Sequence, residues 1–261
     1  MSGIAGVFLR SHMGWLEPRD HFSMLGALAH RGAKGFEFWT NPNHTMLMLY
    51  ARSKGGSDLP FFLDADSVLC VNLDGRIYNC SDLPDRFRKE GADCFAGLEG
   101  GFAFALYDER ENALYLVRDK FGARTLYYAE ASPAFVFGSE VKAVLSYAEL
   151  DAKFDLKCLR ASLSGLSLPG TSIFDGVKEV PPGHYVKITG DSIDVRSYCE
   201  PSPGNFDRSV PPEIIREDLV MRLDKAVASH CRGSGLPWFC SDLRDTESSR
   251  PDTACRLVRS I

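Results

Sequence analysis

The sequence predicts an α+β fold in which short strands outnumber helices. Apolar segments of strand length recur from the N-terminus to about residue 188, and Gly, Asp or Asn residues separate many of them. Two of these segments, 102–107 and 113–117, are joined by five polar residues and predict a hairpin that is buried on both faces. Other segments carry apolar residues at helical spacing.

The first elements alternate between strand and helix. Residues 4–8 and 45–51 are apolar segments of strand length, and each adjoins a turn-rich or charged stretch. Between them, residues 19–29 place Phe22 and Leu25 at helical spacing, which predicts a helix.

A series of short elements follows. The predicted strands are 67–71, 76–78, 101–107, 113–118, 126–129 and 134–138. Residues 141–147 and 156–162 then predict two short helices. Two last strands, 173–177 and 185–188, flank a Pro-Pro-Gly turn at 181–183, which reverses the chain.

The composition changes after about residue 198. Residues 199–212 are rich in Pro, Ser, Gly and Asn and predict a linker, so we place a first domain at 1–198. Within the remainder, 213–261, apolar residues recur every four positions and predict a helix over 213–229 with an apolar face formed by Ile215, Leu219, Leu223 and Val227. The stretch from residue 233 onward has few apolar residues, and we expect it to be largely disordered.

The charge balance excludes several classes of partner. The chain has a formal net charge of -5 and no basic tract, which argues against binding to nucleic acid or to a membrane surface. Its apolar runs are far shorter than the roughly 18 residues that a membrane span needs. The N-terminus lacks the basic region and cleavage site of a secretion signal, so we expect a cytoplasmic protein.

The cysteines do not predict a metal site or a disulfide framework. All eight are scattered without a CxxC pair, which is typical of reduced thiols. We therefore expect no bound metal in this chain.

Seven short motifs occur in the order found in one enzyme family. Together they cover roughly residues 1–198, and the chain resembles the N-terminal amidotransferase domain of glutamine-hydrolysing asparagine synthetases. The motifs are Met1-Ser2-Gly3-Ile4-Ala5-Gly6, His30-Arg31-Gly32, Gly75-x-Ile77-Tyr78-Asn79, Gly101 to Asp108, Arg118-Asp119-x-x-Gly122-x-x-x-Leu126-Tyr127-Tyr128, Ser139-Glu140-x-Lys142-Ala143 and Pro181-Pro182-Gly183-His184.

The resemblance implies a class II glutamine amidotransferase with an N-terminal-nucleophile hydrolase fold, a four-layer α/β/β/α sandwich of two mostly antiparallel sheets. In that family, removal of the initial Met exposes a Cys that attacks the glutamine amide, with its own α-amine as the base. Here Ser2 occupies the nucleophile position. A serine hydroxyl is much less acidic than a thiol and depends more on its base.

The family oxyanion hole is an Asn-Gly pair, and this chain has Asp74 and Gly75 there. An aspartate replaces an amide donor by a charged acceptor, and loss of one such donor typically costs about 100- to 1,000-fold in rate. The dipeptide is also a good turn sequence, which gives it a purely structural interpretation.

Two arginines correspond to substrate-binding positions. Arg76 stands where the family has a Glu that receives the glutamine ammonium group, so its charge is reversed. Arg52 matches the Arg that binds the substrate carboxylate, although a surface arginine is an equally good interpretation.

The family also has an ATP-dependent synthetase domain, marked by a Ser-Gly-Gly-x-Asp-Ser loop. Residues 241–249 lie where that loop is expected but lack both glycines. We therefore expect 213–261 to be the truncated start of a synthetase-like domain. No cofactor is expected in this chain, because ATP and Mg would belong to the missing domain.

The leading hypothesis is a degenerate amidotransferase domain that is retained as a folding or docking module. One alternative is an active N-terminal-serine amidohydrolase with a substrate other than glutamine. Another is the glutaminase part of an asparagine synthetase, which supplies ammonia for amide formation. The expected partners are a glutamine-like small molecule, a synthetase-domain protein and a second copy of the chain.

Overall fold

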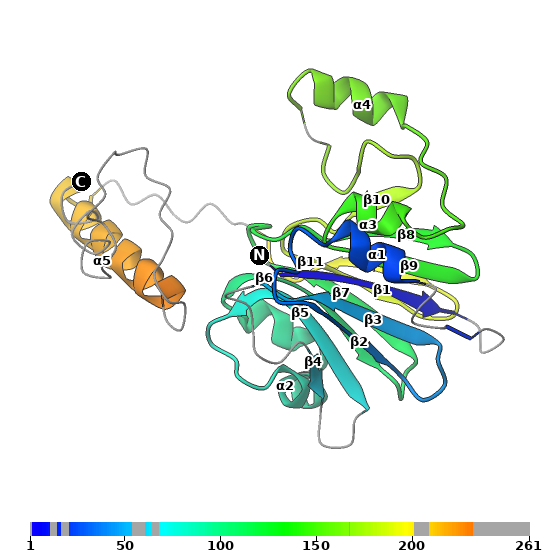
Figure 1. The fold of residues 1–261 in the computed structure, drawn as a ribbon. Helices are drawn as coiled ribbons and strands as arrows, with labels where there is room; N and C mark the ends of the chain where they lie inside the picture. The colour runs from blue at the N-terminus through cyan, green and yellow to red at the C-terminus, as the bar shows by residue number, and fades with distance from the viewer. Residues whose placement is uncertain are drawn as a thin grey trace. The chain divides into compact units, whose positions relative to one another are not determined.

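The computed structural model describes residues 2–10, 15–16, 21–53, 61–63, 68–166, 168–200 and 209–231 (Figure 1). The chain divides into one compact unit over Met1–Glu200 and a second over Pro201–Ile261. The first unit contains two six-stranded sheets, and the second contains a single described helix, α5 (Pro212–Cys231).

The first sheet has the order β10-β8-β9-β1-β3-β2, and every neighbouring pair is antiparallel. Its central strand, β1, comes from the start of the chain and pairs with β9 on one side and β3 on the other. The strand bounds are β1 Gly3–Leu9, β2 Phe36–Thr40, β3 Met46–Ala51, β8 Tyr127–Ala131, β9 Ala134–Gly138 and β10 Val177–Glu179.

The second sheet has the order β12-β11-β7-β6-β5-β4, again with antiparallel pairs throughout. The predicted hairpin lies at its centre as β6 and β7. The strand bounds are β4 Phe61–Leu63, β5 Leu69–Ile77, β6 Gly100–Asp108, β7 Ala113–Arg118, β11 His184–Ile188 and β12 Ile193–Ser197.

The apolar core lies in three layers because successive side chains of a strand point to opposite faces. Along β1, Ile4 and Phe8 pack between the two sheets, whereas Ala5 and Val7 face the other way. The same alternation holds in the second sheet, where alternate residues of β6 enter either the central layer or an outer one.

Helices cover both outer faces, which gives the four-layer α/β/β/α sandwich (Figure 1). The first sheet packs against α1 (Phe22–Ala27) and α3 (Val141–Leu145). The second sheet packs against α2 (Leu83–Glu90) and the 3-10 helix η2 (Gly91–Gly97). The α+β fold class expected from the sequence is confirmed by this arrangement of antiparallel sheets and outer helices.

A capped helix begins after the strand β5. The Asp82 side chain accepts a hydrogen bond from Asp85 N at the start of α2, and Pro84 lies in the first turn. Both features favour the start of a helix at this point. A further helix, α4 (Leu156–Leu163), begins in the same way with Asp155 as its cap.

Several predicted elements need correction. The strands predicted at 67–71 and 76–78 are one continuous strand, β5, because Asp74 and Gly75 pair with β6 instead of forming a turn. The strand predicted at 173–177 is reduced to an isolated bridge at Phe174, and β10 begins only at Val177. The sequence analysis also missed α2, η2, β2, β4 and β12.

The second unit is described by α5 alone. Its apolar residues Ile215, Leu219 and Leu223 are exposed. The predicted disordered stretch lies outside the described residues. Among the helices that the structure describes, none is both long and apolar enough to cross a membrane.

Candidate functional site

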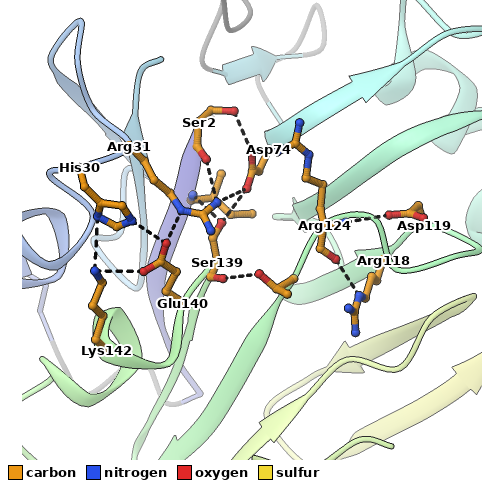
Figure 2. A network of polar contacts seen from close by, with 12 residues as sticks. Ser2, His30, Arg31, Asp74, Arg118, Asp119, Arg124, Ser139, Glu140 and Lys142 are labelled. Carbon is orange, nitrogen blue, oxygen red and sulfur yellow. Dashed lines mark hydrogen bonds and ion pairs between the residues drawn. The ribbon is translucent and has the colours of Figure 1, made fainter. Parts of the chain in front are cut away.

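Ser2 lies directly before β1, at one end of the central strand of the first sheet. Its side chain is buried, and its Oγ donates a hydrogen bond to Asp74 Oδ1 at 2.8 Å (Figure 2). Asp74 belongs to β5 of the second sheet, so this bond connects the two sheets. The structure therefore brings together two of the residues that the sequence predicts for the site.

The Asp74 carboxylate is completely buried and has three donors. Besides Ser2, Arg31 Nη1 donates to its Oδ2 at 3.2 Å and Ser139 Oγ donates at 3.1 Å. Burial raises the pKa of Asp74, although the charge of Arg124, the Ser2 bond and the charge of Arg31 each oppose this rise. Asp74 therefore gives up its proton less readily than an exposed aspartate.

Arg31 is the centre of a wider polar network. Its Nη1 also donates to the Ser2 carbonyl at 3.1 Å, and its Nε donates to Glu140 (Figure 2). Glu140 in turn contacts His30 Nε2 at 2.8 Å and Lys142 Nζ at 3.2 Å. Burial raises the pKa of Glu140, but the bonds from Arg31, Lys142 and His30 outweigh it and give a net lowering.

Ser139 fixes the N-terminal end of β1 against the end of β9. Its Oγ accepts a hydrogen bond from Ile4 N at 2.9 Å, and its backbone N donates to Ile4 O at 2.8 Å. Thr125 Oγ1 donates to the Ser139 carbonyl at 2.7 Å. The backbone around Ser2 is consequently held from two directions.

Arg124 lies near Asp74 on a tightly bonded turn. Its backbone N donates to Asp119 Oδ2 at 3.2 Å, and its carbonyl accepts from Arg118 Nε at 2.7 Å. Asp119 also accepts from the backbone of Phe121 and Ala123. This turn positions a positive charge close enough to oppose the rise in the pKa of Asp74.

Gly75 is required by a close approach of two strands. It has φ +104° and pairs with Phe102 of β6. A Cβ at this position would lie 2.2 Å from the Gly101 carbonyl oxygen, so a larger residue cannot fit without a shift of the backbone. The turn interpretation of Asp74-Gly75 is therefore wrong, because both residues belong to a strand.

Arg52 follows β3 and forms an ion pair with Glu37 of β2. Burial raises the pKa of Tyr50, whose hydroxyl lies near Ser2, Asp74 and Arg52. Arg52 is thus a neighbour of the Ser2 site.

Arg76 lies two residues after Asp74 on β5, on the same face of the strand, whereas Val71, Leu73 and Ile77 face the outer helices. It also borders a cavity of about 330 Å³, whose lining includes Gly75, Ile77 and Leu83 of α2. Within the described residues, no cluster of three His, Cys, Asp or Glu side chains could hold a metal ion.

The sequence analysis missed most of the residues that surround Ser2. Arg31, Ser139 and Glu140 lie in two of the quoted motifs, but no role was assigned to them. Ser139 directly follows a predicted strand, Glu140 directly precedes a predicted helix, and Arg31 lies two residues after another. The topology brings all three to one end of the first sheet.

The chain is similar to a known protein family and to several curated proteins. Residues 85–199 match a family model described as a glutamine amidotransferase domain. Asparagine synthetase [glutamine-hydrolyzing] 3 of Bacillus subtilis is 32% identical over 218 residues, which cover 72% of this chain and 35% of the relative.

Two further relatives also match this chain over only part of their own length. Putative asparagine synthetase [glutamine-hydrolyzing] 1 of Methanocaldococcus jannaschii is 45% identical over 64% of this chain and 34% of its own length. Amidase chry2 of Gibberella zeae is 28% identical over 62% of this chain and 27% of its own length. The chain spans about a quarter to a third of the length of these curated relatives.

Among solved structures, the glutamine phosphoribosylpyrophosphate amidotransferase of B. subtilis aligns with a TM-score of 0.48 and 17% identity. The alignment covers 76% of this chain and 49% of that one.

Proposed function

Because the chain carries a class II glutamine amidotransferase domain of the asparagine synthetase family, we propose that this domain no longer hydrolyses glutamine and is kept as a folding or docking module. The observation that carries the proposal is the 2.8 Å hydrogen bond from Ser2 Oγ to the buried Asp74 carboxylate. The residue at the nucleophile position and the residue at the oxyanion position contact each other.

This contact opposes both the attack of Ser2 on an amide and the stabilisation of the oxyanion that the attack forms. The Ser2 hydroxyl is buried and directs its proton at Asp74, so it is not presented to a substrate. A tetrahedral intermediate on Ser2 would develop negative charge beside the Asp74 carboxylate. Loss of an oxyanion donor alone costs about 100- to 1,000-fold in rate, and a carboxylate adds repulsion to that loss.

Arg31 makes the arrangement rigid. It holds the Ser2 carbonyl and the Asp74 carboxylate with one nitrogen and Glu140 with another. A buried carboxylate that has three donors is a stable structural unit, since all of its bonds would have to be replaced before Asp74 could turn away. The network therefore supports a structural role for these residues.

An assay of ammonia release from glutamine tests the proposal. We expect the purified chain to release ammonia no faster than buffer, and Ser2→Ala to give the same rate. A glutamine-hydrolysing relative serves as the positive control for the assay. Turnover that Ser2→Ala abolishes would overturn the proposal and would favour a glutaminase that supplies ammonia for amide formation.

One observation favours a second function, an N-terminal-serine amidohydrolase with another substrate. Asp74 lies within hydrogen-bond distance of Ser2 Oγ, and its raised pKa makes it a stronger base than an ordinary aspartate. In this function Asp74 would accept the Ser2 proton. Intact-mass measurement is the first test: if Met1 is retained, Ser2 is not the N-terminal residue of the protein, and an N-terminal-serine amidohydrolase is excluded.

The docking role is tested by measuring binding to a partner protein. We expect a synthetase-domain protein to bind this unit, with an affinity that can be measured by calorimetric titration. Comparison of the wild-type chain with Arg31→Ala, which disturbs the network, would show whether the intact network is needed for binding.

A further inference from the structure

Among the described strands, β2 is the last strand on one side of the first sheet, and one of its edges faces away from β3. Directly before β2, Gly35 O accepts a hydrogen bond at 2.9 Å from the N–H of Arg52, which follows β3. Bonding directions alternate along an antiparallel strand, so the N–H and C=O groups of Phe36, Phe38 and Thr40 point away from β3. Such a row of backbone groups is a template for the pairing of another strand.

Three exposed phenylalanines adjoin this edge. Phe36 and Phe38 lie on the outer face of the first sheet, because they pair with Ala51 and Leu49, which belong to the outer apolar cluster. Phe22 of α1 lies beside them, with its ring centroid 6.2 Å from that of Phe38. The three residues are 44–50% exposed and form an aromatic patch of about 300 Å². An apolar patch of this size on a monomer is often functional.

The other edges of the two described sheets are less suited to pairing. Strands β4 and β10 have three residues each, and β12 carries the charged residues Asp194 and Arg196. Short strands and charged side chains are common means by which proteins prevent pairing at an edge. β2 has five residues and a single charged one, Glu37, which forms an ion pair with Arg52 of the same chain. Of the described edges, β2 is therefore the one that best accepts a further strand.

We propose that two copies of the chain form a dimer by antiparallel pairing of their β2 strands. A twofold axis at Phe38 places Phe38 opposite its own copy and Phe36 opposite Thr40 of the second copy. All three outward-directed residues then exchange backbone hydrogen bonds across the axis, and the same surface serves both copies. The aromatic patches of both copies meet on the outer face of the joined sheet. Ser2 and Asp74 take no part in this interface, so the dimer does not depend on whether the chain hydrolyses an amide.

The side chains of β2 select the position of the axis. An axis at Glu37 would place two carboxylates directly opposite each other, where like charges destabilise a strand pair. An axis at Trp39 would leave Phe36 beyond the end of the other strand. With the axis at Phe38, Glu37 lies opposite Trp39 of the second copy and two phenylalanines form a favourable cross-strand pair.

The dimer should be weak. Its aromatic patch is well below the roughly 800 Å² per partner that is typical of stable complexes. We therefore expect a Kd of about 10–100 µM. Sedimentation velocity of the full chain between about 2 and 400 µM should show a shift from monomer to dimer. A monomer at every concentration in this range would overturn the proposal.

A charge at the axis should prevent the dimer. Phe38→Lys places two like charges opposite each other and should raise the Kd by at least about tenfold. The matched control is Val195→Lys on the edge strand β12, because Val195 is an apolar residue that is 48% exposed. The control should leave the Kd unchanged. Undiminished dimerisation of Phe38→Lys, or loss of the dimer in Val195→Lys, would show that another surface joins the copies and would overturn the proposal.

Cysteine cross-linking tests the register and does not require that Phe38→Lys folds. In the proposed pair, the two residues at position 38 have Cα atoms about 5.5 Å apart, within the range of about 4.4–6.8 Å that a disulfide spans. Oxidation of Phe38→Cys by air and copper phenanthroline should therefore link two chains through position 38, as identified by peptide mass spectrometry.

The control for the cross-link is Phe36→Cys. In the proposed register its two copies lie about 14 Å apart along the paired strands, so they should not form a disulfide. Absence of the link at position 38, or equal linking at position 36, would contradict the proposed pairing.

Discussion

The Ser2 hydroxyl and the Asp74 carboxylate are joined by a 2.8 Å hydrogen bond between the two sheets. Both positions differ from the pattern of the family that the sequence resembles, and the two differences contact each other. If only one of the two residues were changed back to the family residue, the other would lose its present hydrogen-bond partner. This coupling determines the first prediction.

Stepwise reversal of the three altered positions should restore glutamine hydrolysis only in combination. Ser2→Cys alone should remain inactive because Asp74 stays beside the developing oxyanion. Addition of Asp74→Asn should raise ammonia release about 100- to 1,000-fold, which is the usual contribution of one oxyanion donor. Addition of Arg76→Glu should lower the KM for glutamine, because it restores the negative charge that receives the glutamine ammonium group in the family. If Ser2→Cys alone were as active as the triple variant, Asp74 would not be the obstacle.

The pH dependence of stability should have opposite signs for the two carboxylates of the network. Burial raises the pKa of Asp74 from its ordinary value of 3.8, so the folded chain binds this proton more tightly than the unfolded chain. Asp74 therefore destabilises the fold as the pH rises through this raised pKa. The pKa of Glu140 is lowered from 4.5, so its stabilisation is present above pH 4.5 and is lost as the pH falls through the lowered pKa.

Urea unfolding of two variants, measured between about pH 3.5 and pH 7, checks these signs. Relative to wild type, Asp74→Asn should become more stable as the pH rises, whereas Glu140→Gln should become less stable. Parallel curves for the two variants would contradict the assigned directions.

Ser139→Ala should destabilise the chain by about 1–3 kcal/mol, because it leaves the buried Ile4 N–H without its acceptor and removes a donor from Asp74. The matched control is Ser146→Ala at a partly exposed position, where a bond to the Lys142 carbonyl is lost. That control should change the free energy of unfolding by less than about 0.5 kcal/mol. Urea unfolding measures both, and equal values would show that the Ser139 bonds contribute little.

Two glycine substitutions should have opposite effects. Gly75→Ala places a Cβ against the Gly101 carbonyl oxygen and should cost more than about 3 kcal/mol, since a strand must shift and φ is positive. Gly26→Ala in α1 meets no atom within 4 Å and should stabilise the chain by about 0.5 kcal/mol. Thermal unfolding distinguishes them, and a stable Gly75→Ala would contradict the register of β5 with β6.

Strands buried on both faces could be predicted from the sequence. Continuous apolar runs gave β1, β3, β6 and β9 to within a residue or two, because such runs have few alternatives in a chain of this composition. The edge strands β2 and β12 were missed, although Ile193–Ser197 alternates apolar and polar residues as a half-exposed strand should. β5 was divided in two because Asp-Gly is a common turn dipeptide, and only the pairing with β6 reveals its extended conformation.

The candidate site was predictable as separate residues but not as a network. The resemblance identified Ser2, Asp74 and Gly75 by position, and the structure places Ser2 and Asp74 in contact. The sequence could not show that Arg31, Ser139 and Glu140 complete the arrangement, since their contacts depend on how the two sheets stack. Nor could it show the cavity that Arg76 borders, because this depends on where α2 covers the sheet.

The pairing of β1 also has a consequence for how the chain folds. Ser2 bonds to a residue 72 positions away, and Ile4 bonds to one 135 positions away. During synthesis, β1 is made before β9, so the centre of the first sheet is complete only after β9 has followed, and contacts so distant in sequence form slowly. The Ser2 network therefore forms only when the segments that contain Ser2, Asp74 and Ser139 have met. Protection of the Ile4 amide proton from exchange would report this last stage of assembly.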